Sequence, residues 1–129
     1  MTTSTAQLRA PETGDYPFLD FGTAFFEASQ ADPDKLAVID ETGSQTWADF
    51  AHLACCVAGR LAADGVGPGQ RVAGLADNSA NYLALYAGVL LSGACMVPLP
   101  TSANASTLSK MMADCGARHL FASNRHQST

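Results

Sequence analysis

Apolar residues recur at two spacings along this chain of 129 residues, and each spacing predicts a different kind of element. Steps of three or four residues place side chains on one face of a helix, whereas short apolar runs between turn residues suit buried strands. Four segments have the helical spacing: Phe18-Phe21-Phe25-Phe26, Phe50-Leu53-Val57-Leu61, the apolar residues of 80–92, and Leu108-Met111-Met112-Cys115. In the third segment the apolar residues lie nearly all round the helix, which predicts cover on more than one side.

Residues with capping or turn preferences separate these helices from the rest of the chain. The first helix is expected to end at Asp32-Pro33, because proline disfavours a helical residue before it. Thr46 can cap the second helix through its hydroxyl, with Asp49 three residues later, and Asp77-Asn78-Ser79 offers caps for the third. A glycine that can close a helix in the left-handed conformation follows each of the last three stripes, at Gly65, Gly93 and Gly116.

The strand candidates lie between these helices. Segments 36–40 and 44–46 flank residues 41–43, which predicts a hairpin whose turn is provided by Gly43. Segments 72–76, 95–99 and 119–122 alternate with helices, and this pattern is typical of right-handed parallel crossovers. The sequence therefore predicts an α/β fold of alternating strands and helices, forming part of a doubly wound parallel sheet with a leading β-hairpin.

One run near the middle of the chain resembles a family motif. Gly65-Val66-Gly67-Pro68-Gly69-Gln70-Arg71-Val72 is similar to the G-V-G-P-G-D-R-V segment of the adenylate-forming enzymes, the acyl-CoA synthetase and ligase superfamily. Other pieces resemble the family in the same order, at 32–40, 46–50, 77–79, 88–99 and 114–118, so that the resemblance covers residues 21–122. Departures from the family pattern are Gln70 for an acidic residue, Trp47 for Tyr, and Asp49-Phe50 for Glu-Leu.

The resemblance implies a parent reaction in which a carboxylic acid and ATP form an acyl-adenylate and pyrophosphate, followed by transfer to coenzyme A or another thiol. In the family, the phosphate loop ending in Pro-Lys-Gly, the later adenine, magnesium and ribose contacts, the hinge and the C-terminal lysine all lie downstream. No counterpart of them occurs in this chain. We therefore expect an N-terminal fragment of such a ligase that is inactive alone. ATP, magnesium and coenzyme A are implied for a complete member, and no cofactor is expected in this chain.

A non-catalytic interaction module derived from the same family is the alternative interpretation. In either case the expected partner is the remainder of a synthetase, or another chain, bound through exposed apolar surface. Such a surface is expected because the sheet of the family is covered by several hundred further residues. The residues expected to contribute to it are Phe25, Tyr86 and Met112.

Composition indicates the domain organisation and argues against some classes of partner. Residues 1–15 are poor in residues that could be buried and predict a disordered leader; residues 16–123 are expected to form the N-terminal part of the synthetase large domain, and 124–129 a ragged tail. A net charge of -5 with seven Lys and Arg argues against nucleic acid and anionic membranes as partners. No apolar stretch approaches the ~20 residues of a membrane span, and no signal-peptide pattern occurs, so we expect a cytoplasmic protein.

The cysteines and histidines suggest structural roles. Cys55, Cys56, Cys95 and Cys115 lack C-x-x-C or metal-ligand spacing and are interpreted as small apolar core residues in a reducing compartment. We expect His52 to be a solvated or boundary residue on a helix. His126 is expected to be disordered, and His119 lies close to the same end of the chain.

The glycine-rich run is not predicted to bind phosphate. Its spacing departs from the P-loop pattern, Pro68 removes one backbone donor, and a strand follows it where a helix would be needed. Arg71 is interpreted as a structural charge at the entrance of that strand. Pro98 to Thr101 occupy the kind of position where doubly wound sheets bind ligands, although the position alone does not identify a chemical role. We name no catalytic residue, no cofactor-binding residue and no metal ligand.

Overall fold

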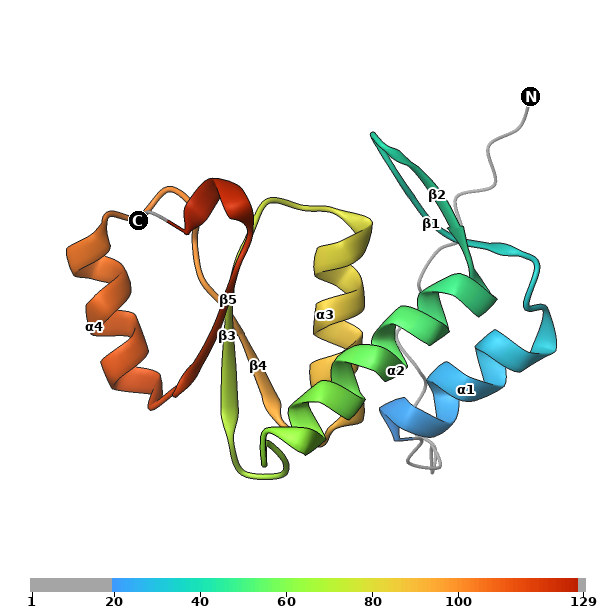
Figure 1. The fold of residues 1–129 in the computed structure, drawn as a ribbon, viewed down its shortest axis with the longest axis horizontal. Helices are drawn as coiled ribbons and strands as arrows, with labels where there is room; N and C mark the ends of the chain where they lie inside the picture. Colours follow the sequence, from blue (N-terminus) through green and yellow to red (C-terminus); the bar gives the residue numbers. More distant parts are fainter. Residues whose placement is uncertain (1–19, 128–129) are drawn as a thin grey trace, which may run out of the picture.

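The computed structural model describes residues 20–127 of the chain (Figure 1). The helices are α1 (Phe21–Ala31), α2 (Trp47–Ala63), α3 (Ala80–Leu91) and α4 (Ala105–Cys115), followed by a short 3-10 helix, η1 (Asn124–His126). The strands are β1 (Leu36–Asp40), β2 (Gly43–Thr46), β3 (Arg71–Leu75), β4 (Cys95–Pro98) and β5 (His119–Ala122). The predicted leader at 1–15 lies outside the described residues, as does Phe18 of the first predicted stripe.

A three-stranded parallel sheet of order β4-β3-β5 organises the C-terminal half. Val72 of β3 is paired with Met96 of β4 on one side and with His119 of β5 on the other. The crossover from β3 to β4 and the crossover from β4 to β5 run in opposite directions, so right-handed connections place α3 and α4 on opposite faces of the sheet (Figure 1). The predicted doubly wound arrangement is confirmed.

The leading hairpin is also confirmed, but its turn differs from the prediction. Asp40 is paired with Gly43, so that Glu41 and Thr42 alone form the turn. The Asp40 carboxylate holds this turn, because its Oδ1 accepts hydrogen bonds from the Thr42 amide at 2.8 Å, the Thr42 hydroxyl at 2.7 Å and the Gly43 amide at 3.1 Å. The glycine contributes a positive φ of 152° at the first residue of β2.

The helix boundaries coincide with side-chain caps, of which the one at Thr46 was predicted and the one at Asp20 was not. Thr46 Oγ1 accepts a hydrogen bond from the Asp49 amide at 3.2 Å and starts α2. Asp20 Oδ1 accepts one from the Thr23 amide at 2.9 Å, and this cap starts α1 at Phe21. The glycines that follow α2, α3 and α4 all have a positive φ, as expected: Gly65 (76°), Gly93 (82°) and Gly116 (68°).

The buried side chains form three clusters. One cluster, between α1, α2 and α3, is aromatic: Phe25 stacks edge-on against Trp47 and Phe50, with centroids 6.0 and 5.6 Å apart. A second cluster lies between α2, α3 and the sheet, and a third lies under α4, where Leu108 packs against Leu75. Phe25 is only 6% exposed, so its expected place in an exposed apolar patch is wrong.

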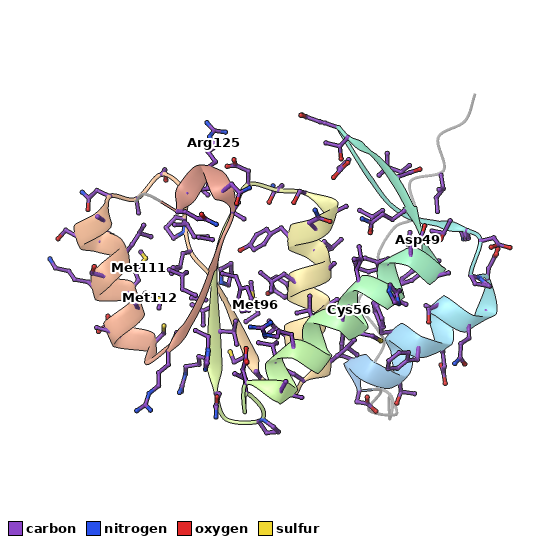
Figure 2. The ribbon with its side chains drawn as sticks, in the orientation of Figure 1. Asp49, Cys56, Met96, Met111, Met112 and Arg125 are labelled. Atoms are coloured by element: carbon purple, nitrogen blue, oxygen red, sulfur yellow. The ribbon has the colours of Figure 1, made fainter. Side chains whose placement is uncertain are left out.

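The prediction that the cysteines are core residues is wrong as well. Cys55, Cys56 and Cys95 are exposed and Cys115 is half-buried, all four as free thiols. On α2, where Figure 2 labels Cys56, the stripe from Phe50 through Ala54 to Leu61 occupies the core side. Positions 55 and 56 are rotated by more than a quarter turn from that stripe, so they face outward. None of the described helices has the length and apolar content that a membrane span requires.

Candidate functional site

The carboxyl ends of the three parallel strands meet at one edge of the sheet. The Leu99 amide donates to the Gly74 carbonyl at 2.8 Å, and the Ser123 amide donates to the Leu75 carbonyl at 3.0 Å, so the strands stay together to their ends. Beyond this point the chain leaves β3 toward α3 and β4 toward α4, on opposite faces. Such a divergence is where doubly wound sheets form ligand crevices. Residues 98–101 lie at this edge, as predicted.

Asp77, just after β3, connects the loop at this edge to the segment after β5. Its Oδ2 lies 3.1 Å from Nη1 of Arg125, and its Oδ1 lies 3.3 Å from Nε2 of His126. The His126 side chain is only 13% exposed, and its amide donates to the Ser123 carbonyl at 2.8 Å. The prediction that His126 is disordered is therefore wrong. Figure 2 shows Arg125 extending outward from η1, and such an exposed ion pair contributes little to stability.

A hollow of about 590 Å³ lies beside this connection, between α4, β5 and the carboxyl end of β3. Its polar lining residues are Ser109, His126 and Gln127. The remaining lining side chains are apolar: Leu75, Leu99, Ala105, Leu108, Met112, Leu120, Phe121 and Ala122. This surface suits the packing of an apolar group, and its Ser109 and His126 are not hydrogen-bonded to each other as a nucleophile and a base would be.

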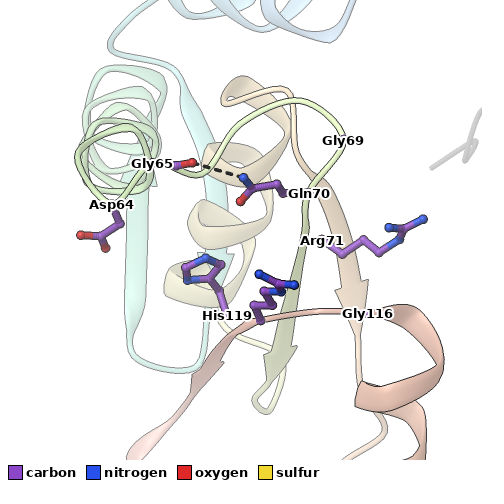
Figure 3. Close-up of a pocket in the computed structure, with 8 residues that line it drawn as sticks. Asp64, Gly65, Gly69, Gln70, Arg71, Gly116 and His119 are labelled. Carbon is purple, nitrogen blue, oxygen red and sulfur yellow. Dashed lines mark hydrogen bonds between the residues drawn. The ribbon is translucent and has the colours of Figure 1, made fainter.

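A second, more polar hollow of about 340 Å³ lies at the opposite, amino edge of the sheet (Figure 3). The lining residues are Asp64, Gly65, Gly69, Gln70, Arg71, Gly116, Arg118 and His119. Nε2 of Gln70 donates to the Gly65 carbonyl at 3.3 Å and braces the glycine-rich loop. Figure 3 shows the Arg71 side chain extending away from His119, so these two groups do not converge on one point.

The position of this loop supports the interpretation of its glycines as turn residues. Helices α2 and α4 both end at this hollow, and the free carbonyls of helix C-termini carry partial negative charge. Phosphate is favoured at the opposite end of a helix, where free amides point outward. Arg71 is the first residue of β3 and is exposed. This position agrees with its interpretation as a structural charge at the entrance of the strand.

The perturbed titratable groups serve as caps and core contacts. The amide of Ala80 donates to Asp40 at 3.0 Å, and this bond, with those from the Thr42 hydroxyl and amide, lowers the pKa of Asp40 from 3.8 to about 2. Bonds from Thr23 lower the pKa of Asp20. Burial, with Tyr86 nearby, raises the pKa of Tyr82, whose hydroxyl donates to the Gly74 carbonyl at 3.3 Å.

Groups that could act as metal ligands or bases are scattered. Within residues 20–127, no three His, Cys, Asp or Glu side chains are grouped so that they could hold a metal ion. His52 is exposed, as predicted, with its Nε2 3.7 Å from Sγ of Cys56. Sequence reasoning missed the bonds of Asp40 to Ala80 and of Asp77 to His126, which join residues 40 and 49 positions apart.

A model of the family described as AMP-binding enzyme matches residues 25–129, which is most of the chain. The chain belongs to the AMP-binding enzyme family. The resemblance to adenylate-forming enzymes is confirmed, and the fold of this family member agrees with solved relatives. The N-terminal domain of FACL13 from Mycobacterium tuberculosis superposes with a TM-score of 0.80 at 26% identity, covering 84% of this chain and 28% of that one.

Relatives of this AMP-binding family member include ligases of two kinds. The medium-chain fatty-acid–CoA ligase of Escherichia coli (strain K12) is 31% identical over 117 residues, which are 90% of this chain and 20% of that protein. The fatty acid–[acyl-carrier-protein] ligase ScoC of Streptomyces coeruleorubidus is 33% identical over 99 residues, 77% of this chain and 19% of that protein. The chain spans about a fifth of the length of these curated relatives.

The described residues do not fit ATP with magnesium. The glycine-rich loop lies beside helix C-termini, which disfavours phosphate, and the described part contains no cluster of three metal-ligating side chains. The carboxyl-edge hollow is apolar except at His126, Gln127 and Ser109. We therefore assign no step of an adenylation reaction to the residues of this AMP-binding family member.

Proposed function

We propose that the chain forms the N-terminal part of the large domain of an acyl-adenylate-forming ligase. In the complete ligase, a carboxylic acid and ATP give an acyl-adenylate, which is passed to a thiol. One observation carries the proposal. The fold of this chain, over 84% of its length, matches 28% of the length of the solved N-terminal domain of FACL13. The chain supplies scaffold, and the nucleotide site comes from other sequence.

The chain alone does not catalyse adenylation under this proposal. ATP, magnesium and coenzyme A belong to the complete ligase, and the absence of a fitting nucleotide site within residues 20–127 supports this division. The relatives act on fatty acids according to their names, which supports a carboxylic acid as the substrate class. A cytoplasmic location is supported by the three exposed free thiols, which persist in reducing compartments.

ATP–pyrophosphate exchange tests the proposal directly. The purified chain is incubated with ATP, magnesium, labelled pyrophosphate and a panel of acetate, fatty, aromatic and amino acids. A full-length relative serves as the positive control. We expect exchange at background level with every acid. Exchange above background that is abolished by heat denaturation would mean that a nucleotide site exists in this chain and that the proposal is wrong.

A non-catalytic docking module is the second candidate function. It is favoured by large apolar side chains that remain in solvent, such as Leu120 and Phe121 on β5, which are 48% and 36% exposed. The coding sequence beyond Thr129 distinguishes the ligase fragment from the docking module. A Ser/Thr/Gly-rich loop ending in Pro-Lys-Gly, in frame or after a frameshift, supports the ligase, and a stop codon followed by unrelated sequence supports the module.

A further inference from the structure

A shallow apolar groove follows α3 between the hairpin and α1. It consists of two adjoining hollows, of about 420 and 200 Å³, which share Leu83 and Tyr86. The larger hollow extends to Ile39 on β1, and the smaller one extends to Phe21 on α1 and Trp47 on α2. Because the two hollows share lining residues, they form one continuous surface from the hairpin to the first turn of α1.

This groove exposes side chains that would normally be covered. Ile39 is 72% exposed, Leu83 47% and Phe21 41%. Leu83, Tyr86 and Leu90 follow one another at steps of three and four residues, so they form one stripe of α3. The other faces of α3 pack against α2 and the sheet. The described residues cover this stripe only in part, since Leu83 is exposed and Tyr86 and Leu90 are half-buried.

We propose that this groove is occupied by the chain's own segment 16–19, Tyr16-Pro17-Phe18-Leu19. The segment leads directly into Asp20, which caps α1, and Phe21 is the next residue and lines the groove. A covalent tether of this length keeps the local concentration of the segment high, so binding needs few contacts. The inference is independent of the proposed ligase function, because it concerns contacts within the 129 residues alone.

The segment is long enough for the groove, and its attachment at Asp20 is extended. The backbone of Asp20 is extended, with φ -69° and ψ 153°, so the chain enters the helix from an extended direction. Pro17 restricts its own φ and favours an extended Tyr16. Four extended residues reach about 13 Å, and the stripe from Leu83 to Leu90 is about 10 Å long on a helix. The segment is therefore long enough to cover the stripe.

The chemistry of the segment also matches. Three of its four side chains are large and apolar or aromatic, and it carries no charge. The lining of the smaller hollow is entirely apolar or aromatic, with Phe21, Phe25, Trp47 and Phe50 among its residues. Aromatic rings gain from edge-on contacts with other rings, as Phe25 already makes with Trp47 and Phe50.

Trp47 provides the test, because it is the sole tryptophan of the chain and lines the groove. The full chain is compared with the double variant Tyr16→Ser/Phe18→Ser and with Leu8→Ser, a matched loss of an apolar leader residue outside the segment. Acrylamide quenching of Trp47 fluorescence measures access to the groove. We expect stronger quenching and a red-shifted emission in the double variant, and values unchanged from the parent chain in Leu8→Ser.

A second background shows whether the contact is with the groove. In Leu83→Ser, an exposed substitution on the stripe, the double variant should add little further quenching, because part of the binding surface is already lost. Far-UV circular dichroism checks the folding of each variant, and the single variant Tyr16→Ser replaces the double one if helix content falls. Equal quenching in the parent chain and the double variant overturns the proposal. Quenching that depends on protein concentration and not on Phe18 also overturns it, since a second copy would then be the occupant.

Discussion

Asp40 links the hairpin to the first turn of α3, because its carboxylate accepts hydrogen bonds from both. Its Oδ2 accepts from the Ala80 amide, while Oδ1 accepts from Thr42 and Gly43. Ser79 caps the same helix through the Tyr82 amide at 3.1 Å. Two side chains therefore satisfy amides at one helix end, and only Asp40 does so from a distant part of the sequence.

The substitution Asp40→Asn should lower the stability of the chain. An amide that keeps its oxygen on Thr42 and Gly43 turns its own N–H groups toward the Ala80 N–H, which places donor against donor. The pKa of Asp40 is lowered from 3.8 to about 2 in the folded chain. The carboxylate therefore stabilises the fold fully above pH 3.8, and this contribution is lost as the pH falls through about 2. Urea unfolding of both chains, from neutral pH downward, should show a difference in stability that shrinks over this interval.

Glu41→Gln is the control for that experiment, because it removes a charge from the neighbouring turn position without touching the Ala80 amide. A pH-independent difference between the parent chain and Asp40→Asn would contradict the assigned role. So would an equal loss of stability in Glu41→Gln.

The exposed thiols give a second residue-level prediction. Cys55, Cys56 and Cys95 should react with a thiol reagent in the folded chain without denaturant, whereas the half-buried Cys115 should react more slowly. Mass spectrometry of the labelled peptides identifies each site. A chain whose four cysteines all require denaturation would place them in the core, as the sequence had suggested, and would contradict the orientation of α2.

Close contact between α2 and α3 depends on one glycine. A Cβ added at Gly88 would lie 2.5 Å from the side chain of Val57 and 2.8 Å from the Ala54 carbonyl. Gly88→Ala should therefore force the helices apart and lower the free energy of unfolding by about 1–3 kcal/mol, the usual cost of overpacking. Gly59→Ala is the matched control within α2, because a Cβ there has no atom within 4 Å.

The control should move in the opposite direction. Alanine is the better helix former, so Gly59→Ala should raise the free energy of unfolding by up to about 1 kcal/mol. Urea denaturation of the two variants and the parent chain measures both effects. Stabilisation by Gly88→Ala would mean that the two helices can separate without loss of packing.

Element types and their order could be predicted from the sequence because each depends on nearby residues. Thr46, Gly65 and Gly116 act within a few positions of themselves, and periodicity places Phe50 and Leu61 on the core side of α2. Boundaries moved slightly: β3 begins at Arg71, one residue before the predicted strand, because the pairing of Arg71 with Cys95 extends the ladder.

Contacts between distant parts of the chain were not predictable in the same way. The bond of Asp40 to Ala80 and the pairing of His126 with Asp77 depend on which loops the sheet topology brings together. Composition misled the interpretation of the cysteines, since a preference for burial does not specify the face of a helix. For the candidate site, the sequence predicted the position of residues 98–101 at the carboxyl edge but not the apolar hollow beside it, which needs α4 and β5 in place.

The two edge strands of the parallel sheet, β4 and β5, differ in how readily they can pair with a strand of another molecule. The β4 edge contains Pro98 and is followed by Pro100, and proline protects an edge because it cannot donate to an added strand. The β5 edge has neither proline nor lysine nor an acidic residue, and it exposes Leu120 and Phe121. An unprotected edge of this kind pairs readily with other chains.

The purified chain should therefore bind a hydrophobic dye and self-associate as its concentration rises, mainly through β5. Leu120→Lys should reduce both effects, because a charged side chain on the open edge disfavours strand pairing. Ile39→Lys places the same charge on a more exposed residue, at 72% against 48%, but on the hairpin, so it should leave self-association nearly unchanged. Size-exclusion chromatography with light scattering measures the mass of each chain across concentrations. A parent chain that stays monomeric at high concentration and binds no dye would show that β5 is not the reactive edge. Equal effects of the two lysines would show that the association does not depend on β5 in particular.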